Sequence, residues 1–237
     1  MSVSQGAAEG PQLRRLPAMP LFELTEASIG YNGAPVLKDI TLKIEPGERV
    51  AFVGPSGAGK STLLSTLYAQ QRARAALVPQ EYALVKNLSV FHNVYMGRLH
   101  RHSSLYNLLN LMHPLASQIG AVQPILTRLG MTELMGKPVG ELSGGQQQRT
   151  AVARALFQGG EVLLGDEPVS SVDPLQSRSV LEAINAAFPT VVLAMHDLEL
   201  ALDFTERLIG LKDGRVAFDR PSAGLRAGDL DAFYRPT

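Results

Sequence analysis

The run Gly54-Pro55-Ser56-Gly57-Ala58-Gly59-Lys60-Ser61 constrains this chain more than any other stretch of its sequence. An apolar run at 49–53 precedes it and a helix-prone run from Thr62 to Leu67 follows it, which gives the order strand, glycine-rich turn, helix. Glycines let the backbone wrap closely around a polyphosphate, and the unpaired N–H groups at a helix start point at the anion. We therefore predict a phosphate-binding loop for a nucleoside triphosphate, in which Lys60 contacts the β- and γ-phosphates and Ser61 supplies a hydroxyl for Mg²⁺.

The bulk composition excludes several classes of protein. Acidic and basic side chains balance, with 22 of each, whereas a protein that binds nucleic acid usually carries a basic excess. The chain has no cysteine, so it has no disulfide, no thiolate nucleophile and no cysteine-ligated zinc. No apolar run reaches the length of about 18 residues that crosses a membrane. We expect residues 1–20 to form a flexible lead-in segment, and any role at a membrane to come through a partner.

Strand-like and helix-like segments alternate along the chain, which predicts an α/β fold with a mainly parallel sheet. A different pattern fills the interval 87–135, which is rich in Leu and Met at helical spacing and contains Pro114 and Pro124. With the helix that follows, it predicts an inserted helical subdomain over about 87–157 within one nucleotide-binding domain at 21–237. The expected strands are 21–30, 40–44, 49–53, 161–164, 190–194 and 207–211, the expected helices are 176–187 and 198–205, and Asp213-Gly214 predicts a hairpin turn with a return strand at 216–218.

The apolar strand at 161–164 leads into two consecutive carboxylates, Asp166 and Glu167. A carboxylate that ends a strand beside a phosphate-binding loop can hold Mg²⁺, and Asp166 fits this role. Glu167 can polarise a water for attack on the γ-phosphorus. Taken alone, the segment could also be an acidic turn at the end of a strand.

A second anion-binding pattern occurs at Leu142-Ser143-Gly144-Gly145-Gln146-Gln147-Gln148-Arg149. Ser143 has the character of a helix N-cap, and glycines and a helix follow it. A serine hydroxyl, glycine N–H groups and a helix N-terminus together can bind an anion. Alone, this run is only a glycine-rich helix start and has weak specificity.

Together with the phosphate-binding loop, this run resembles the signature motif of the ATP-binding cassette (ABC) ATPases. The resemblance extends from about Leu21 onward and implies a P-loop core with an antiparallel lobe and an inserted helical subdomain. It also implies further site residues: Tyr31 stacks on adenine, Gln80 senses Mg²⁺, Asp173 lies in a loop that crosses to a partner, and His196 contacts the γ-phosphate.

The resemblance also implies how the site is assembled from two chains. One ATP would lie between Lys60 and its loop in one subunit and Ser143, Gly144, Gly145 and Gln146 of a second copy, in an ATP-sandwich homodimer. Other expected partners are integral membrane permease subunits and, indirectly, an extracytoplasmic solute-binding protein. The chain is then expected at the cytoplasmic face of the cell membrane, with the permease docked near Tyr82 to Gly97.

The solute is less strongly indicated than the class. Residues 84–99, which end in Gly97-Arg98-Leu99, and Val169 are similar to the corresponding positions of phosphonate-import ATPases. Three alternatives remain open: an importer of another solute, an exporter or cell-envelope system, and a P-loop kinase that phosphorylates a small metabolite. A kinase would have no use for the run at 142–149 or for His196.

One interval departs from the pattern of the family. Gln80 follows Lys60 by only 20 positions, about half of the usual spacing, in which relatives carry a small antiparallel strand pair. We therefore expect a reduced antiparallel lobe, with the phosphate-binding loop and Gln80 retained and the fit of the adenine at Tyr31 in question.

Overall fold

The structure, a computed structural model, describes residues 19–31 and 34–234, and of Tyr31 only the backbone. Residues 1–18 of the predicted lead-in segment therefore lie outside the described residues. The strands are β1 (Phe22–Tyr31), β2 (Ala34–Ile44), β3 (Arg49–Val53), β4 (Ala75–Val78), β5 (Val162–Asp166), β6 (Thr190–Ala194), β7 (Arg207–Lys212) and β8 (Arg215–Pro221). The helices are α1 (Lys60–Gln70), α2 (Val90–Tyr95), α3 (Ser104–Met112), α4 (Ala116–Arg128), α5 (Gly144–Gln158), α6 (Pro174–Ala187), α7 (Leu198–Phe204) and α8 (Asp231–Tyr234).

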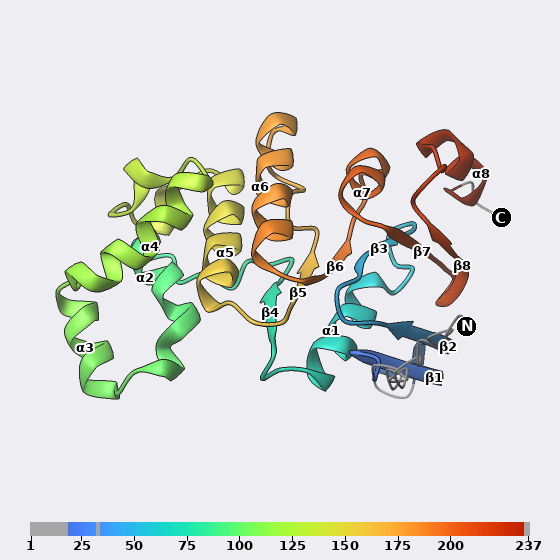
Figure 1. The fold of residues 1–237 in the computed structure, drawn as a ribbon, viewed down its shortest axis with the longest axis horizontal. Coiled ribbons are helices and arrows are strands. Elements are labelled where there is room, and N and C mark those ends of the chain that lie inside the picture. Colours follow the sequence, from blue (N-terminus) through green and yellow to red (C-terminus); the bar gives the residue numbers. More distant parts are fainter. Residues whose placement is uncertain (1–18, 32–33, 235–237) are drawn as a thin grey trace, which may run out of the picture.

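A six-stranded sheet in the order β4-β5-β6-β3-β7-β8 forms the centre of the fold (Figure 1). All pairs in it are parallel except β7–β8. Strands β5 and β6 are buried at all five positions, which explains why the sequence shows continuous apolar runs there rather than an alternating pattern. The predicted α/β fold with a mainly parallel sheet is confirmed.

The sheet ends in the predicted hairpin. Asp213 and Gly214, with φ angles of 52° and 74°, connect β7 to β8. Two successive positive φ angles match the right-handed twist of the paired strands, and the Asp-Gly sequence tolerates them. A β-carbon on Gly214 would also lie 2.2 Å from the carbonyl oxygen of Val36 in β2, so this turn packs directly against the antiparallel lobe.

That lobe consists of β1 and β2, which form a separate two-stranded antiparallel sheet. Only residues 71–74 connect α1 to β4, and they contain no strand. The predicted reduction of the lobe is therefore confirmed: the short interval between Lys60 and Gln80 holds α1, a turn and β4. Leu37, Ile40 and Ile44 of β2 are fully buried and anchor the lobe on the sheet.

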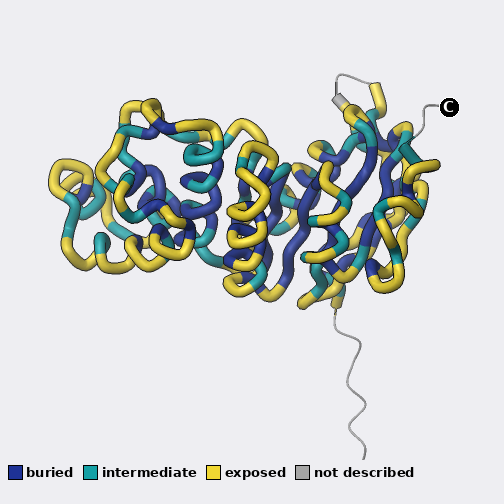
Figure 2. Tube along the Cα trace, turned by 90° about the horizontal axis from the view of Figure 1, so that it is seen from above, coloured by how far each residue is buried: buried dark blue, intermediate teal, exposed yellow. Residues whose placement is uncertain are grey.

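Two apolar clusters lie on opposite faces of the sheet. One includes α1 and the inward side chains of β1 and β2, and the other includes α5, α6 and α7 together with the helices at 90–139. Figure 2 shows the strands of the sheet as mostly buried, in dark blue, and the outward sides of the helices as exposed, in yellow. Burial on both faces fixes the sheet as a rigid platform for the loops at the ends of its strands.

The interval between β4 and β5 is helical. It contains α2, α3, α4 and α5, with short 3₁₀ turns η1 (Met96–Arg101), η2 (Thr132–Leu134) and η3 (Val139–Glu141), and a fourth 3₁₀ turn, η4 (Ala227–Leu230), lies near the C-terminus. Pro114 separates α3 from α4, whereas Pro124 lies inside α4 without ending it. Figure 1 shows these helices at the end of the molecule opposite β1 and β2. In the part of the chain that the structure describes, no helix combines the length and the apolar character needed to cross a bilayer.

Candidate active site

The phosphate-binding loop connects β3 to α1 and depends on glycine backbone geometry. Gly54, Gly57 and Gly59 have φ angles of 147°, 80° and 102°, which side chains with a β-carbon rarely adopt. A β-carbon on Gly54 would lie 2.1 Å from the carbonyl oxygen of Leu211, and no side chain caps the N-terminus of α1. The loop therefore closes tightly on the sheet while the first N–H groups of α1 remain available for an anion.

Lys60 is buried in this loop, with only 6 % of its surface exposed. Its Nζ donates to the carbonyl oxygens of Gly54 and Pro55, at 2.7 and 3.1 Å. Burial lowers the pKa of Lys60, while the carboxylates of Glu167 and Asp166 act in the opposite direction. A buried ammonium group held only by carbonyls is poorly compensated, so an anion beside it would be stabilised.

Asp166 is the last residue of β5 and is only 9 % exposed. Burial raises the pKa of Asp166, and a hydrogen bond from Ser61 partly offsets this effect. Its Oδ1 atom is buried without a hydrogen-bond partner. Carboxylate and hydroxyl oxygens are the ligands that hard divalent cations prefer, so an unpartnered carboxylate oxygen next to Ser61 fits Mg²⁺. The described residues contain no group of three or more acidic or histidine side chains that could hold a metal by themselves.

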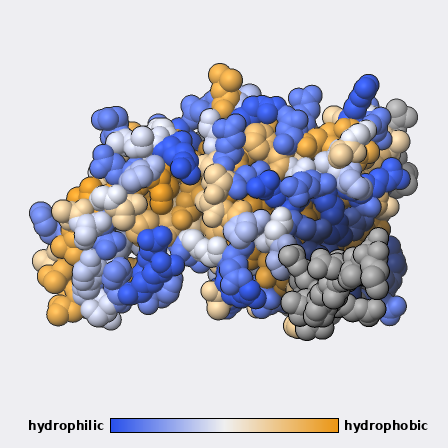
Figure 3. All heavy atoms as spheres, viewed as in Figure 1, coloured by the Kyte–Doolittle hydropathy of each residue, from blue (hydrophilic) through white to orange (hydrophobic). Residues whose placement is uncertain are grey.

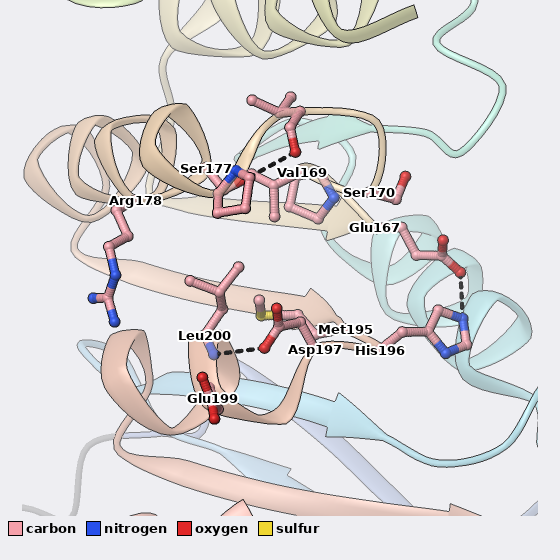
Figure 4. Close-up of a pocket in the computed structure, with 13 residues that line it drawn as sticks. Glu167, Val169, Ser170, Ser177, Arg178, Met195, His196, Asp197, Glu199 and Leu200 are labelled. Carbon is pink, nitrogen blue, oxygen red and sulfur yellow. Dashed lines mark hydrogen bonds and ion pairs between the residues drawn. The ribbon is translucent and has the colours of Figure 1, made fainter.

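Glu167 and His196 form the next pair of functional side chains. The Nε2 atom of His196 lies 2.7 Å from Oε1 of Glu167, and Figure 4 shows the two side chains pointing toward each other from the ends of β5 and β6. We expected the strand of Asp166 and Glu167 directly beside the phosphate-binding loop, but β6 lies between β5 and β3. Because the carboxyl ends of parallel strands meet at one edge of a sheet, His196 after β6 lies at the same edge as the carboxylates after β5 and the loop after β3.

The backbone at Glu167 is held in an unusual conformation, with a φ angle of 53°. Such a conformation is strained for a residue other than glycine and needs support from its surroundings. The fully buried side chain of Gln148 in α5 supplies this support: its Nε2 donates to the carbonyl oxygen of Glu167 and to Oγ of Ser170, at 3.2 Å for the latter. Its Oε1 accepts from the N–H of Ser171 at 2.8 Å. Gln148 therefore connects α5 to the whole loop after β5.

The run at 142–149 forms the predicted helix start. Ser143 is the N-cap of α5 and makes a capping box with Gln146: the Gln146 N–H donates to Ser143 Oγ at 3.4 Å, and the Ser143 N–H donates to Gln146 Oε1 at 3.0 Å. Ser143, Gly144, Gly145 and Asp173 line one open cleft. Asp173 also caps α6 by accepting from the N–H of Gln176 at 3.1 Å.

The two remaining predicted residues, Tyr31 and Gln80, lie at or just after the ends of β1 and β4. Tyr31 ends β1 and pairs with Ala34 of β2, but its side chain lies outside the described residues. Gln80 is exposed directly after β4, where the chain turns through Tyr82 and Ala83 with φ angles of 52° and 47°.

Arg154 and Gln148 are the residues that sequence reasoning missed. Arg154 of α5 donates to the carbonyl oxygens of Tyr82 and Ala83, both at 2.6 Å, and so holds the loop after Gln80 in its strained form. Burial lowers the pKa of Arg154. The only available signal was a polar side chain at the inward spacing of an alanine-rich helix, and that signal does not reveal a partner more than 70 positions away.

Comparison with known proteins agrees with this geometry. The family model described as ABC transporter matches residues 37–170. The chain belongs to this family, as one of its ATP-binding subunits, and is an ATPase.

Among individual proteins, the chain is similar to phosphonates import ATP-binding proteins named PhnC. The protein from Pseudomonas entomophila is 40% identical over 90% of this chain and 91% of its own length. The protein from Maricaulis maris is 36% identical over 87% and 90%.

Solved structures show the same fold. The ADP- and phosphate-bound dimer of the cassette MJ0796 superposes with a TM-score of 0.71 at 25% identity, over 86% of this chain and 99% of that one. An ATP-binding subunit of another ABC transporter reaches 0.72 at 21% identity, over 89% of this chain and 97% of that one, which supports the fold alone.

Proposed function

We propose that two copies of this chain form the ATP-hydrolysing part of an importer for a phosphonate or a similar small anionic solute. The ATPase activity belongs to the family, and similarity to PhnC proteins over about nine-tenths of both chains supports the choice of solute.

We further propose that the nucleotide phosphates lie over the loop at 54–61, with Lys60 exchanging its backbone carbonyl partners for phosphate oxygens. Ser61 and Asp166 would hold Mg²⁺, with Gln80 reaching it from the loop after β4. When bound, the ion would neutralise charge on the phosphate oxygens. The unpartnered, buried Oδ1 of Asp166 supports this assignment most directly.

Glu167 is our candidate for the group that orients and polarises the attacking water. Its side chain is partly buried, and Glu167 directly follows β5 at the same edge of the sheet as the phosphate-binding loop. In this structure His196 occupies one of its oxygens. Movement of His196 to a γ-phosphate oxygen would free that carboxylate oxygen to accept a hydrogen bond from water.

The cleft at the start of α5, which contains the signature motif, is open to solvent. This openness supports a site shared between two chains. The cleft of Ser143, Gly144 and Gly145 is lined on its other side by Ser171 and Asp173, and by no residue of the phosphate-binding loop. The dimeric cassette among the similar structures shows that relatives pair in this class. We propose that a second copy brings its nucleotide to this cleft, so that ATP stabilises the closed dimer by binding it preferentially.

A trapping experiment tests the shared site. Glu167→Gln should retain ATP binding but hydrolyse it at least about 100-fold more slowly, and size-exclusion chromatography should show an ATP-dependent dimer. Lys60→Ala is the control, because it should lose nucleotide binding and stay monomeric with ATP. Hydrolysis by Glu167→Gln at the wild-type rate would remove Glu167 from its role. An ATPase assay without any phosphate acceptor also distinguishes this function from that of a P-loop kinase.

A growth experiment tests the solute. In the source organism, deletion of this gene should abolish growth on a phosphonate as sole phosphorus source and leave growth on inorganic phosphate intact. Wild type supplied from a plasmid should restore growth, and Lys60→Ala should not. Normal growth of the deletion strain on several phosphonates would assign the transporter to another solute while leaving the ATPase activity in place.

A further inference from the structure

Helix α3 has its polar and apolar faces reversed relative to an ordinary surface helix. Leu105, Leu108, Leu109 and Met112, which we call the α3 ridge, are 68, 51, 52 and 77 % exposed. Their spacing of three and four residues places them along one side of the helix. Six of the nine exposed large apolar side chains among the described residues lie between Leu99 and Met112. Figure 3 shows orange atoms gathered at the end of the molecule where Figure 1 places α3.

The polar residues of α3 face the protein and hold it in this orientation. Asn107 accepts from the Tyr95 hydroxyl at 2.7 Å and donates to the Leu99 carbonyl oxygen at 3.0 Å. Asn110 is fully buried and accepts from the N–H of Leu115 at 2.9 Å. The half-buried Asn107 makes hydrogen bonds to α2 and η1 that resist rotation of the helix, because turning the leucines inward would break them. Asn110 contributes only through its Oδ1 atom, since its Nδ2 atom is buried without a hydrogen-bond partner. The exposure of the ridge is therefore built into the fold.

The sequence around the ridge is free of acidic residues. No aspartate or glutamate occurs between Glu81 and Glu133, while the same interval contains Lys86, Arg98, Arg101, Arg128 and four of the five histidines. The chain as a whole is neutral, whereas this interval carries a net charge of +4 because its four basic residues, out of 22 in the chain, have no acidic residues among them. His100, Arg101 and His113 lie close to the two ends of α3 and are exposed. Nη2 of Arg101 donates to the carbonyl oxygen of Gln158 at 3.0 Å, which holds this guanidinium beside the end of α5. An apolar ridge in basic surroundings complements a surface that is both apolar and negatively charged.

The position of the ridge narrows the choice of partner. The turn η1, which leads into α3, contributes Met96, Gly97 and His100 to an open groove with Arg154 and Gln158 of α5. This groove lies in the region where we expect the permease to dock, so the ridge adjoins a membrane-facing side. The cytoplasmic leaflet carries anionic lipid headgroups beside an apolar interior, so it offers both the charge and the apolar contact that this ridge complements.

We propose that α3 lies on the anionic surface of the cytoplasmic leaflet, with the α3 ridge inserted among the lipid headgroups and Arg101 facing lipid phosphates. The contact combines an apolar and a basic signal, and such pairs of signals are what stable but reversible membrane attachment requires. It changes our expectation from the sequence that a membrane role comes only through a partner. The proposal rests on the proposed function only in placing this subunit beside a membrane.

Vesicle co-sedimentation of the purified full chain tests the proposal. Wild type should bind vesicles of phosphatidylcholine with phosphatidylglycerol, bind pure phosphatidylcholine vesicles much more weakly, and be released by high salt. The triple variant Leu105→Ser/Leu109→Ser/Met112→Ser should lower the bound-to-free ratio by about tenfold or more, because it removes most of the apolar contact. Arg101→Glu should weaken binding only to the anionic vesicles.

A matched control removes the same chemistry from elsewhere on the surface. Met19 and Leu175 are 85 and 82 % exposed and lie outside the helical interval, so Met19→Ser/Leu175→Ser should bind vesicles within about twofold of wild type. The ATPase rate of the triple variant, measured without vesicles, shows that the variant is folded and tests the enzyme separately from the lipid contact.

Three outcomes would overturn the proposal. The first is a wild-type protein that binds neither kind of vesicle, and the second is a triple variant that binds like wild type. The third is a triple variant that fails to co-purify with the permease in detergent although wild type does co-purify. This result would make the ridge a contact with protein rather than with lipid.

Discussion

Replacing Gln148 by Met removes the hydrogen bonds between α5 and the loop after β5 while keeping nearly the same shape. Gln148 is 1 % exposed and bonds to the carbonyl oxygen of Glu167 and the N–H of Ser171. Leaving a buried polar group without its partner costs about 1–3 kcal/mol. Ser171 is exposed and water can replace its lost bond, so most of the loss falls on Glu167, whose backbone already adopts a strained φ of 53°.

We therefore expect a total loss of about 2–4 kcal/mol, shared between folding and catalysis. A loss of about 1.4–2.8 kcal/mol in the transition state lowers kcat by about 10- to 100-fold. The KM for ATP should stay within about threefold of wild type, because the phosphate-binding loop has no contact with Gln148 among its described hydrogen bonds. Steady-state ATPase kinetics, combined with urea denaturation, separate the two shares.

The neighbouring Gln147 provides the matched control. Its side chain donates to the carbonyl oxygen of Leu142 at 3.0 Å and does not reach the loop after β5, so Gln147→Met should change kcat by less than about threefold. A folded Gln148→Met enzyme with wild-type kcat would refute the idea that this side chain positions Glu167. Equal losses in both variants would mean that α5 is merely damaged.

Three further predictions concern charge, backbone and loop order. In a metal-chelating buffer, Asp166→Asn should unfold with a higher free energy than wild type at neutral pH, by about 1.4 kcal/mol for each unit by which folding raises the pKa of Asp166. This difference in unfolding free energy should shrink as acid protonates Asp166 in the wild-type protein. A difference that grows in acid would contradict the prediction. Gly54→Ala should cost about 3 kcal/mol or more, since its β-carbon would meet the Leu211 carbonyl oxygen at 2.1 Å, whereas Gly57→Ala, with open space around it, should cost clearly less in the same denaturation assay. Arg154→Met should speed amide hydrogen exchange in the loop after β4 without changing the KM for ATP; unchanged exchange would show that the loop holds itself.

The sequence predicted the elements that depend on local pattern. The buried strands β3, β5 and β6 follow from continuous apolar runs, and the Asp213-Gly214 turn follows from its conformational preference. Ser143 as the N-cap of α5 also follows from local chemistry. The shortened interval after Lys60 correctly indicated a small antiparallel lobe.

Features that depend on the packing of distant segments were not predicted. The order of strands, with β6 between β5 and β3, is set by crossover connections that leave no mark in the residues themselves. The partners of Gln148 and Arg154 lie on other elements, so their helical spacing could show only that they face inward. The reversed polarity of α3 was also missed, because a leucine stripe looks the same in sequence whether it faces the core or the solvent.

The length of α5 has a consequence for how two nucleotide sites in a dimer would be coupled. This single 15-residue helix begins at the cleft that we propose for a second copy's nucleotide, holds the loop of Glu167 through Gln148, and holds the turn beside Gln80 through Arg154. A tilt of this helix would move all three places at once, so a nucleotide bound at one end would alter the geometry at the others. In a dimer, the two α5 helices would couple the two nucleotide sites, and the surface that faces the membrane would respond to both nucleotides together.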